Sequence, residues 1–595
     1  MIDNKQRVRI RFKNKEIFRI YKLPFLGILF LFLQLSVLGQ QKDTANKITI
    51  EILNSKNAFY NKTDSGEYNK FIGDVIFKQG SDTLYCDSAY QNTTTKNFEA
   101  FSNVKIIQKD GTKAFSNYLR YTANTKEAYM QENVSLTDGK NKLHCNELTY
   151  NVGTKTGVYK TGGTLETDST TVSSTEGVYN VQQKEARFTK NVIVKDARYN
   201  IKSEDLTYNT DTKVITFYSK SVITNDKSIL NTSNGTYNSK TGIAHFTGHS
   251  SLYSEEHYLE GDSLYYNKIS GYGYADGHVI SIDTIHHSKL YCGHAEYFKK
   301  QRVLWATIKP VLEQVNGKDT IYIRADTFHA YPLLIPKVEL IKSKKKSVIT
   351  IADTINKKAN IDTNDIVGMK QENSKKINKK NNKHSELISK KTNTIIDSTA
   401  ADTTAPMLFV GYHHVRIFSD SMQGKCDSIS YSRADSTIRL IYAPVMWSHQ
   451  SQILGDTMIL HIDDSGGLKS LYVPNNAFMV SQTGPEIAKL FDQIQGKTLT
   501  AYFKDNAITK MVVFPNAESI YYSKDAKGAY IGETEGTSEK MKIYFENKNI
   551  KKIHFEIDVH QAMTPMEKVD FSAAHLSRFK WLIKEKPMSK QDLFE

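Results

Sequence analysis

The sequence predicts an all-β protein: an elongated open β-jelly roll, in which an antiparallel sheet built from repeats of about 29 residues folds over on itself. A tyrosine recurs at near-constant spacing, and the segments around it alternate apolar and polar residues. Tyr (34) and Phe (27) are abundant and Pro is scarce at 11, a composition typical of strands joined by turns.

The repeat is marked by the tyrosine of the pattern x-Leu-x-Tyr-Asn. Successive markers lie 29 to 31 residues apart, at Tyr60, Tyr90, Tyr121, Tyr150, Tyr179, Tyr208, Tyr237, Tyr266 and Tyr297. A unit of this size cannot bury its apolar side alone, so the units stack and form one continuous apolar strip.

Each repeat contains about two strands and two turns. The segments NELTYN (146–151) and EAYMQENVSLTD (127–138) alternate with period two, and polar turns such as GTKTG (153–157) separate them. Alternation of this kind indicates strands that are buried on one face.

The repeat pattern divides the chain into five parts. Residues 335–404 are rich in Lys and without a period, so we expect a disordered insertion there. The second array is either separate or a continuation of the first, and it includes a predicted short helix at 484–494. In the last part, an amphipathic helix is predicted at 571–585 as a cap over the open end of the stack. The parts are 1–40 (signal peptide or N-terminal anchor), 48–334 (repeat array), 335–404 (insertion), 405–560 (second array) and 561–595 (C-terminal helical cap or tail).

The net charge of +15 is concentrated outside the repeats. Residues 1–22 carry a net charge of +6 and residues 335–404 carry +7, which leaves about +2 for the rest of the chain. Because a nucleic-acid binder needs basic charge on its folded face, this distribution argues against nucleic acid as a partner.

The N-terminus predicts export. A basic stretch precedes the apolar run at 23–39, the order found in secretory signals. Cleavage near Gly39 or Gln40 gives a periplasmic protein, and retention leaves an anchor in the inner membrane.

No motif in the sequence predicts catalysis, a metal site or a cofactor. The four cysteines, Cys86, Cys145, Cys292 and Cys426, occupy a column of small residues four or five positions before a marker tyrosine. Their spacing predicts four free thiols and offers no zinc site. The pairs His286-His287 and His413-His414 are expected at the surface, and the chain is not expected to be an enzyme.

Two segments carry a resemblance to a known family. FIGDVIFKQGSDTLYCDSAYQN (71–92) and EAFSNVKIIQKDGTKAFSNYLRYT (99–122) resemble the OstA-like, LptA-type family of periplasmic lipopolysaccharide transport. The resemblance covers about residues 48–330. The chain looks like the long members of this family from Bacteroidetes-type bacteria. This resemblance implies a β-jelly roll whose apolar interior holds lipid A acyl chains. It also implies an inner-membrane exporter and an outer-membrane translocon as partners, with possible end-to-end self-association.

We therefore expect a bridge protein that moves lipopolysaccharide from the inner to the outer membrane. Alternatives are a secreted structural β-repeat protein such as an adhesin with a solid core, a glycan-binding scaffold with outward tyrosines, and a β-helix lyase. The facing of each strand stays open, because a one-residue slip exchanges inside and outside. The candidate groove residues are Val75, Phe77, Phe98, Met130, Val134, Leu136, Phe188, Val192, Val194, Phe217, Val222, Phe246 and Leu252.

Overall fold

The computed structural model describes residues 49–63, 66–316, 319–333, 405–432, 434–463, 467–504, 507–546 and 549–595. The predicted export signal and the insertion at 335–404 lie outside these residues. Ile50–Glu595 form one compact unit. No helix in the described part of the chain is long and apolar enough to cross a bilayer.

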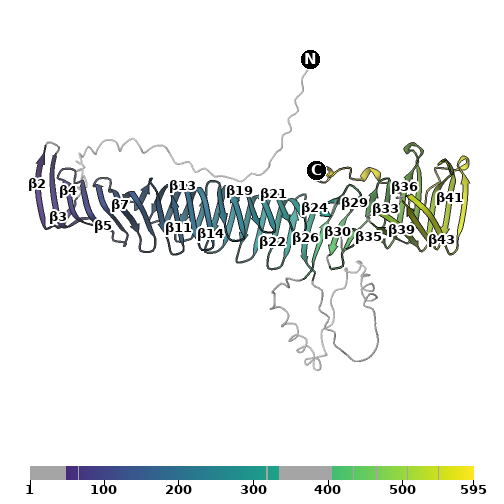
Figure 1. Cartoon of the computed structure of the whole chain (residues 1–595), viewed down its shortest axis with the longest axis horizontal. Coiled ribbons are helices and arrows are strands. Elements are labelled where there is room, and N and C mark those ends of the chain that lie inside the picture. Colours follow the sequence, from purple (N-terminus) through teal and green to yellow (C-terminus); the bar gives the residue numbers. More distant parts are fainter. Residues whose placement is uncertain are drawn as a thin grey trace, which may run out of the picture. The chain divides into compact units, whose positions relative to one another are not determined.

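The unit consists of antiparallel strands that follow one another in sequence order (Figure 1). The first strands are β1 (Glu51–Asn54), β2 (Asn57–Thr63), β3 (Gly66–Gln79), β4 (Asp82–Asn92), β5 (Phe98–Ile107), β6 (Lys113–Thr122), β7 (Glu127–Thr137), β8 (Lys142–Asn151), β9 (Thr156–Tyr159), β10 (Gly163–Glu166), β11 (Thr170–Ser174), β12 (Glu176–Asn180), β13 (Glu185–Asp196), β14 (Tyr199–Asn209) and β15 (Val214–Phe217).

The middle strands are β16 (Ser221–Thr224), β17 (Ser228–Thr232), β18 (Asn234–Asn238), β19 (Ile243–Ser254), β20 (His257–Asn267), β21 (Tyr272–Asp283), β22 (Ser288–Phe298), β23 (Val303–Thr307), β24 (Val311–Asn316), β25 (Asp319–Arg324) and β26 (Thr327–Pro332).

The last strands are β27 (Met407–Tyr412), β28 (Val415–Phe418), β29 (Gln423–Cys426), β30 (Ser428–Ser432), β31 (Thr437–Ile441), β32 (Val445–Ser448), β33 (Ser451–Leu454), β34 (Thr457–Ile462), β35 (Leu468–Val473), β36 (Ala477–Thr483), β37 (Leu490–Gly496), β38 (Thr498–Lys504), β39 (Ala507–Phe514), β40 (Ala517–Lys524), β41 (Tyr530–Ser538), β42 (Lys540–Glu546), β43 (Asn549–Glu556) and β44 (His560–Pro565). Short 3₁₀ turns are η1 (Glu486–Ala488), η2 (Met566–Lys568), η3 (Ile583–Glu585) and η4 (Gln591–Leu593).

Each long strand is bent near its middle by a β-bulge. The register shifts between Phe101 and Val104 in β5, and again between Thr189 and Val192 in β13. The bulges recur with the repeat, and residues with positive φ such as Asn103 (53°) occupy them. Because a bulge bends and twists its strand, a line of bulges folds the sheet along its length.

An aspartate of the repeat fixes several of these bends. Asp87 accepts a hydrogen bond of 2.8 Å from Nδ2 of Asn103, and Asp456 accepts one of 2.8 Å from Nδ2 of Asn476. In both cases the aspartate binds a positive-φ asparagine at the bend of the neighbouring strand.

Folding brings the two edges of the sheet together. One row of turns, edge A, includes 108–112, 138–141 and 167–169, and the other row, edge B, includes 152–155 and 181–184. Side chains from opposite edges are bonded, for example Asn141 Nδ2 to Thr210 Oγ1 at 3.3 Å. We call the line where the edges face each other the seam. The all-β, folded-over repeat fold predicted from the sequence is confirmed.

The sheet continues without interruption past the insertion. β26 pairs with β27 over six residue pairs, from Thr327↔Tyr412 to Pro332↔Met407. β25 pairs with β28 in the same way. The two predicted arrays are therefore one array, and β26 and β27 pair although about seventy residues separate them in the sequence.

The helix predicted at 484–494 is wrong. Only the three residues of η1 are helical, and β37 forms a hairpin with β36, with Thr483 opposite Leu490. Leu490 and Phe491 are buried at 3% and 8% exposure. Pairing with an adjacent strand satisfies the backbone of this segment and outweighs its local helical pattern.

The helix predicted at 571–585 is also wrong, because glutamine side chains of the sheet bind the backbone of this segment. Nε2 of the buried Gln493 donates to the carbonyl of Ala574 at 2.9 Å, and its Oε1 accepts from the amide of Leu576 at 2.9 Å. Gln452 binds Leu582 in the same way at 3.0 Å. These bonds replace the i→i−4 bonds of a helix and hold the tail extended.

The tail lies along the sheet rather than over its end. Its apolar residues pack on strands β33, β36 and β37, and η4 contacts β25 and β28. The predicted cap over the open end of the stack is therefore wrong as well. The packed side chains are Leu576, Phe579 and Trp581 against Phe478, Val480 and Phe491.

Candidate functional site

A cavity of about 2490 Å³ runs between the two halves of the folded sheet. Its walls are apolar side chains that face each other across the fold, such as Phe246 and Leu264 from one half and Leu252 and Leu290 from the other. Sites for small molecules usually measure about 300–1,000 Å³. The residues that line this cavity are spread along the chain from Tyr199 to Phe545.

Small residues on one half of the sheet make the cavity. One cross-strand row is continuous through the repeats. It contains Phe188, Leu206 and Phe217 before the cavity, then Phe246 and Leu264 at the start of the cavity wall, and Ala275 and Ala295 further along that wall. Because an alanine leaves most of the space of a phenylalanine empty, the same fold is filled in one stretch and hollow in the next.

The cavity opens along the seam. Edge A lines it with Asp283, His286 and Asp319, and edge B lines it with Lys268 and Lys299. Because turn residues of both edges reach the same space, the edges do not close over it. The opening is polar and the interior apolar, an arrangement suited to an amphiphile with its polar part outside.

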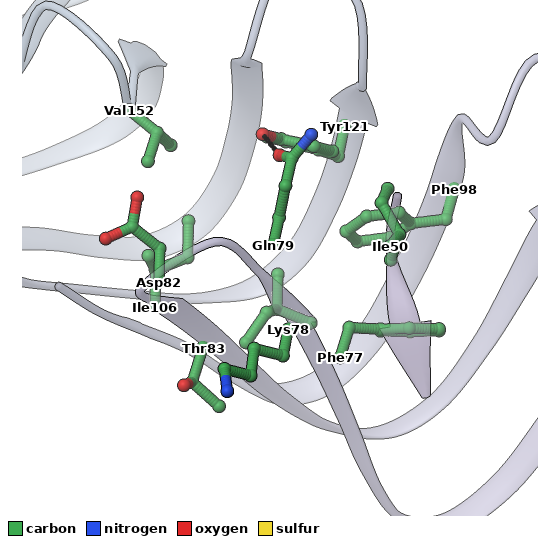
Figure 2. Close-up of a pocket in the computed structure, with 11 residues that line it drawn as sticks. Ile50, Phe77, Lys78, Gln79, Asp82, Thr83, Phe98, Ile106, Tyr121 and Val152 are labelled. Atoms are coloured by element: carbon green, nitrogen blue, oxygen red, sulfur yellow. Dashed lines mark hydrogen bonds between the residues drawn. The ribbon is translucent and has the colours of Figure 1, made fainter. Parts of the chain in front are cut away.

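The region before the cavity is packed. Residues 66–217, which we call the packed region, contain large side chains with almost no exposure, for example Phe188 at 1% and Phe217 at 0%, and only Arg198 and Tyr199 of this range border the cavity. Residues 240–545 form the cavity region. At the N-terminal end, Figure 2 shows Phe77 and Phe98 beside a pocket of only about 30 Å³, with Tyr121 bonded to Gln79.

The exposed fraction of the marker tyrosines differs between the two regions. Tyr150 and Tyr208 are 0% exposed in the packed region, whereas Tyr266 and Tyr297 are 36% and 42% exposed beside the cavity. The four markers from Tyr121 to Tyr208 point inward, whereas Tyr90 is 39% exposed, so the packed region lacks the row of outward tyrosines that a glycan-binding scaffold requires.

The structure places the thirteen candidate groove residues in three settings. Phe246 and Leu252 line the large cavity. Val222 is 37% exposed, so its predicted inward facing is wrong: Ser221 is buried and Ile223 lines the cavity, a slip of one residue. The other ten are buried in the packed region: Val75, Phe77, Phe98, Met130, Val134, Leu136, Phe188, Val192, Val194 and Phe217.

Sequence reasoning therefore missed most of the cavity wall. Residues such as Leu290, Leu312 and Ile323 lie in the later repeats, where the marker pattern is weaker. A usable signal was present: Ala275 stands at the repeat position of Phe188 and Phe246, and Ala295 stands at the position of Leu206 and Leu264. The large inward residues predicted to form the groove mostly fill the packed region, and the small residues border the open space.

Several histidines in the described part of the chain pair with aspartates at the surface. Asp262 accepts from Nδ1 of His278 at 2.7 Å, and this bond lowers the pKa of the carboxyl group. His414 and Asp326 form a similar exposed pair at 2.7 Å. In the described ranges, no group of three His, Cys, Asp or Glu side chains is placed to hold a metal ion.

The cysteines are free thiols inside the fold. Burial raises the pKa of Cys86 to about 12, and the other three thiols are raised to the same value by the same cause. A thiol with this pKa is protonated at neutral pH and is a poor nucleophile.

Comparison with known proteins supports the resemblance seen in the sequence. Residues 46–204 match the family described as OstA-like protein, which confirms the resemblance over that part of the chain. No curated protein matches the chain. One solved structure that matches is LptH from Pseudomonas aeruginosa, the LptA homologous periplasmic component of a lipopolysaccharide transport device. Its alignment has 13% identity and a TM-score of 0.19, and it covers 24% of this chain and 95% of LptH, a likeness too slight to transfer any property.

Proposed function

We propose that this chain, OstA-like over residues 46–204, is a periplasmic bridge protein that holds the acyl chains of lipopolysaccharide and helps to move this lipid from the inner to the outer membrane. One observation carries the proposal: a cavity of about 2490 Å³ with two apolar walls that is open along a polar seam. The protein acts by binding, without a catalytic step.

The physical basis is burial of methylene groups. Each buried CH₂ is worth about 0.8 kcal/mol, so a lipid with several acyl chains needs a long apolar wall to leave a membrane. Successive repeats present similar walls, such as Leu252, Leu290 and Leu312 in one cross-strand row. A lipid can therefore step between neighbouring positions of similar free energy instead of falling into one deep site.

The ends of the sheet suit strand addition by partners. Every residue of β1 and β2 is exposed, including Phe59 at 51% and Tyr60 at 60%. An uncovered edge strand pairs with another chain through its free backbone groups. We propose the inner-membrane exporter, the outer-membrane translocon or a second copy of this chain as the partner at these ends.

Photocrosslinking in living cells tests the proposal. A photoreactive phenylalanine analogue replaces Phe246, which lines the cavity, and His245 on the opposite face of the same strand serves as the matched control. We expect a lipopolysaccharide adduct at position 246 and none at 245. Equal labelling, or no adduct at 246 in a folded, exported chain, would contradict lipid carriage in the cavity.

A second function is favoured for one part of the molecule. The packed region has a filled core, as a structural β-repeat protein requires, with Phe77 and Phe98 stacked at 4.8 Å. On this alternative, residues 66–217 are a rigid spacer and lipid never enters them. A photoreactive residue at Phe188 that is never labelled under any condition would favour the spacer.

A further inference from the structure

Three lysine–aspartate ion pairs close the seam over the packed region. Lys184 Nζ of edge B lies 2.6 Å from Asp138 of edge A, and Lys213 Nζ lies 2.6 Å from Asp168. Lys155 pairs with Asp110 in the same way. The partners are 45 or 46 residues apart and belong to opposite rows of turns. We call each pair a clasp.

The backbone of each clasp lysine is held in an unusual conformation. Lys155, Lys184 and Lys213 have φ of 57°, 58° and 60°. Lys96 and Lys126, at the same position of the two preceding repeats, also have positive φ (63° and 58°), so the turn itself imposes this conformation. The turn aims this lysine across the seam rather than into solvent.

The clasps end where the cavity begins. The same turn position is occupied by Gly242 (φ 68°) and Gly271 (φ 75°) in the next two repeats, and glycine has no side chain to cross the seam. A Cβ on Gly242 would lie 2.7 Å from Cβ of Lys268, which lines the cavity. At the boundary between the two regions, glycine therefore replaces the lysine whose side chain crosses the seam.

The closed seam buries polar groups at a cost. Beneath the clasps, Tyr179 and Tyr208 are 1% and 0% exposed, so the closed seam buries their hydroxyl groups next to the clasp residues Asp138 and Lys213. Burial of a polar group opposes the state that buries it. Parting of the edges would hydrate both groups. The clasps oppose this tendency, and each is partly exposed and individually weak.

We propose that the three clasps form a gate: their release parts the seam and extends the cavity into the packed region, so that an acyl chain can pass from one end of the sheet to the other. The inference rests on the function proposed above. It assigns Lys155, Lys184 and Lys213 and their aspartates the role of setting how far lipid travels along the chain.

Charge reversal of the clasps tests the gate in the full-length exported chain. The open variant carries Asp110→Lys, Asp138→Lys and Asp168→Lys, and its matched control adds Lys155→Asp, Lys184→Asp and Lys213→Asp to restore attraction. In a third variant, Asp138→Cys and Lys184→Cys are joined by a short bis-maleimide. A photoreactive residue at Phe188 lies beneath the clasps, and one at Phe246 reports the cavity; purified lipopolysaccharide is the probe.

We expect the open variant to raise the adduct at position 188, relative to that at 246, at least fivefold above wild type. The restored variant should return to the wild-type ratio, and the linked variant should show no adduct at 188. The gate is overturned if reversal leaves the ratio unchanged or if the linked chain is labelled at 188 as strongly as the open one.

Hydrogen exchange without lipid separates this inference from the function on which it rests. Amides of β13 and β14 should exchange at least tenfold faster in the open variant than in the restored one, with the amides of β38 and β39 unchanged as an internal control. Unchanged exchange in β13 and β14 overturns the gate. Loss of the adduct at 246 alongside faster exchange overturns lipid carriage and leaves the gate standing.

Discussion

The packed region and the cavity region are built from the same repeat and differ in what fills it. Both have hairpins of similar length, a central line of bulges and a marker tyrosine at the same position. In one, phenylalanines such as Phe188 fill the fold and ion pairs close the seam. In the other, Ala275 and Ala295 leave a space and Gly242 leaves the seam open. A change of side-chain volume at a few positions thus converts a solid stack into a container.

We expect the largest difference in stability between the two regions when a buried phenylalanine is replaced by alanine. Phe188→Ala removes a side chain with 1% exposure, and we expect a loss of about 3–5 kcal/mol in the stability of the surrounding repeats. Phe246→Ala is the matched variant, and its loss should be about half as large, because this ring already borders open space. Since a repeat array unfolds locally, hydrogen exchange in β13 and β19 is the measurement. Equal losses would contradict the contrast in packing.

The next effect concerns the cavity itself. Ala275→Leu together with Ala295→Leu should fill part of the wall and displace about two methylene groups of a bound acyl chain. At about 0.8 kcal/mol for each, retention of lipopolysaccharide should fall about tenfold. His245→Leu places the same apolar side chain on the outer face, away from the cavity, and should leave retention unchanged. A binding assay with purified lipopolysaccharide compares the variants, and no loss in the double variant would place the lipid elsewhere.

The two regions should also respond to pH in opposite directions. In the cavity region, burial raises the pKa of Asp492 to about 6, above the value of about 3.9 in an unfolded chain. The ionised form is therefore disfavoured by folding, and the stability of β37 and β40 should fall by about 2 kcal/mol as pH rises from 4 to 7. Asp492→Asn should remove this slope in hydrogen exchange; a slope that persists would assign it to another group.

In the packed region, the change of stability with pH should be smaller and of opposite sign. Burial opposes ionisation of Asp138, but the amide of Asn141 and the ammonium group of Lys184 outweigh it and lower its pKa to about 2. The clasp is therefore complete above pH 4 and is lost as pH falls toward 2. Because Lys184 is 39% exposed, we expect a loss of only about 1 kcal/mol, seen as faster exchange in β8 and β13. Asp138→Asn should show no such loss.

The smallest effect is expected from the cysteines, which behave alike in both regions. Cys86 and Cys145 of the packed region and Cys292 and Cys426 of the cavity region have pKa values raised by burial to about 12. Iodoacetamide at pH 7.5 should label none of them in the folded chain and all four in urea. Labelling of Cys292 or Cys426 alone in the folded chain would show that the cavity admits water to that column.

The sequence predicted the class of fold because the repeat is local. The spacing of Tyr121, Tyr150 and Tyr179, the alternation beside them and the polar turns all act within about 29 residues, the range that strand pairing between neighbours requires. Ten of the thirteen candidate groove residues are buried in the packed region and two line the cavity. Only Val222 faces outward, because one residue of register inverts a short strand.

The sequence by itself determined the repeat, the strands, the inward apolar strip and the free cysteines, since each depends on contacts between adjacent hairpins. The tertiary structure alone decided where the cavity lies, because the volume left by Ala275 depends on what faces it across the fold. It also decided the fate of the two predicted helices: the β36 partner and the side chains of Gln452 and Gln493 supply hydrogen bonds from outside the segment. The local sequence of a segment does not reveal hydrogen bonds that come from distant residues. The seam, the clasps and the extended tail all depend on such distant contacts, so only the tertiary structure shows them.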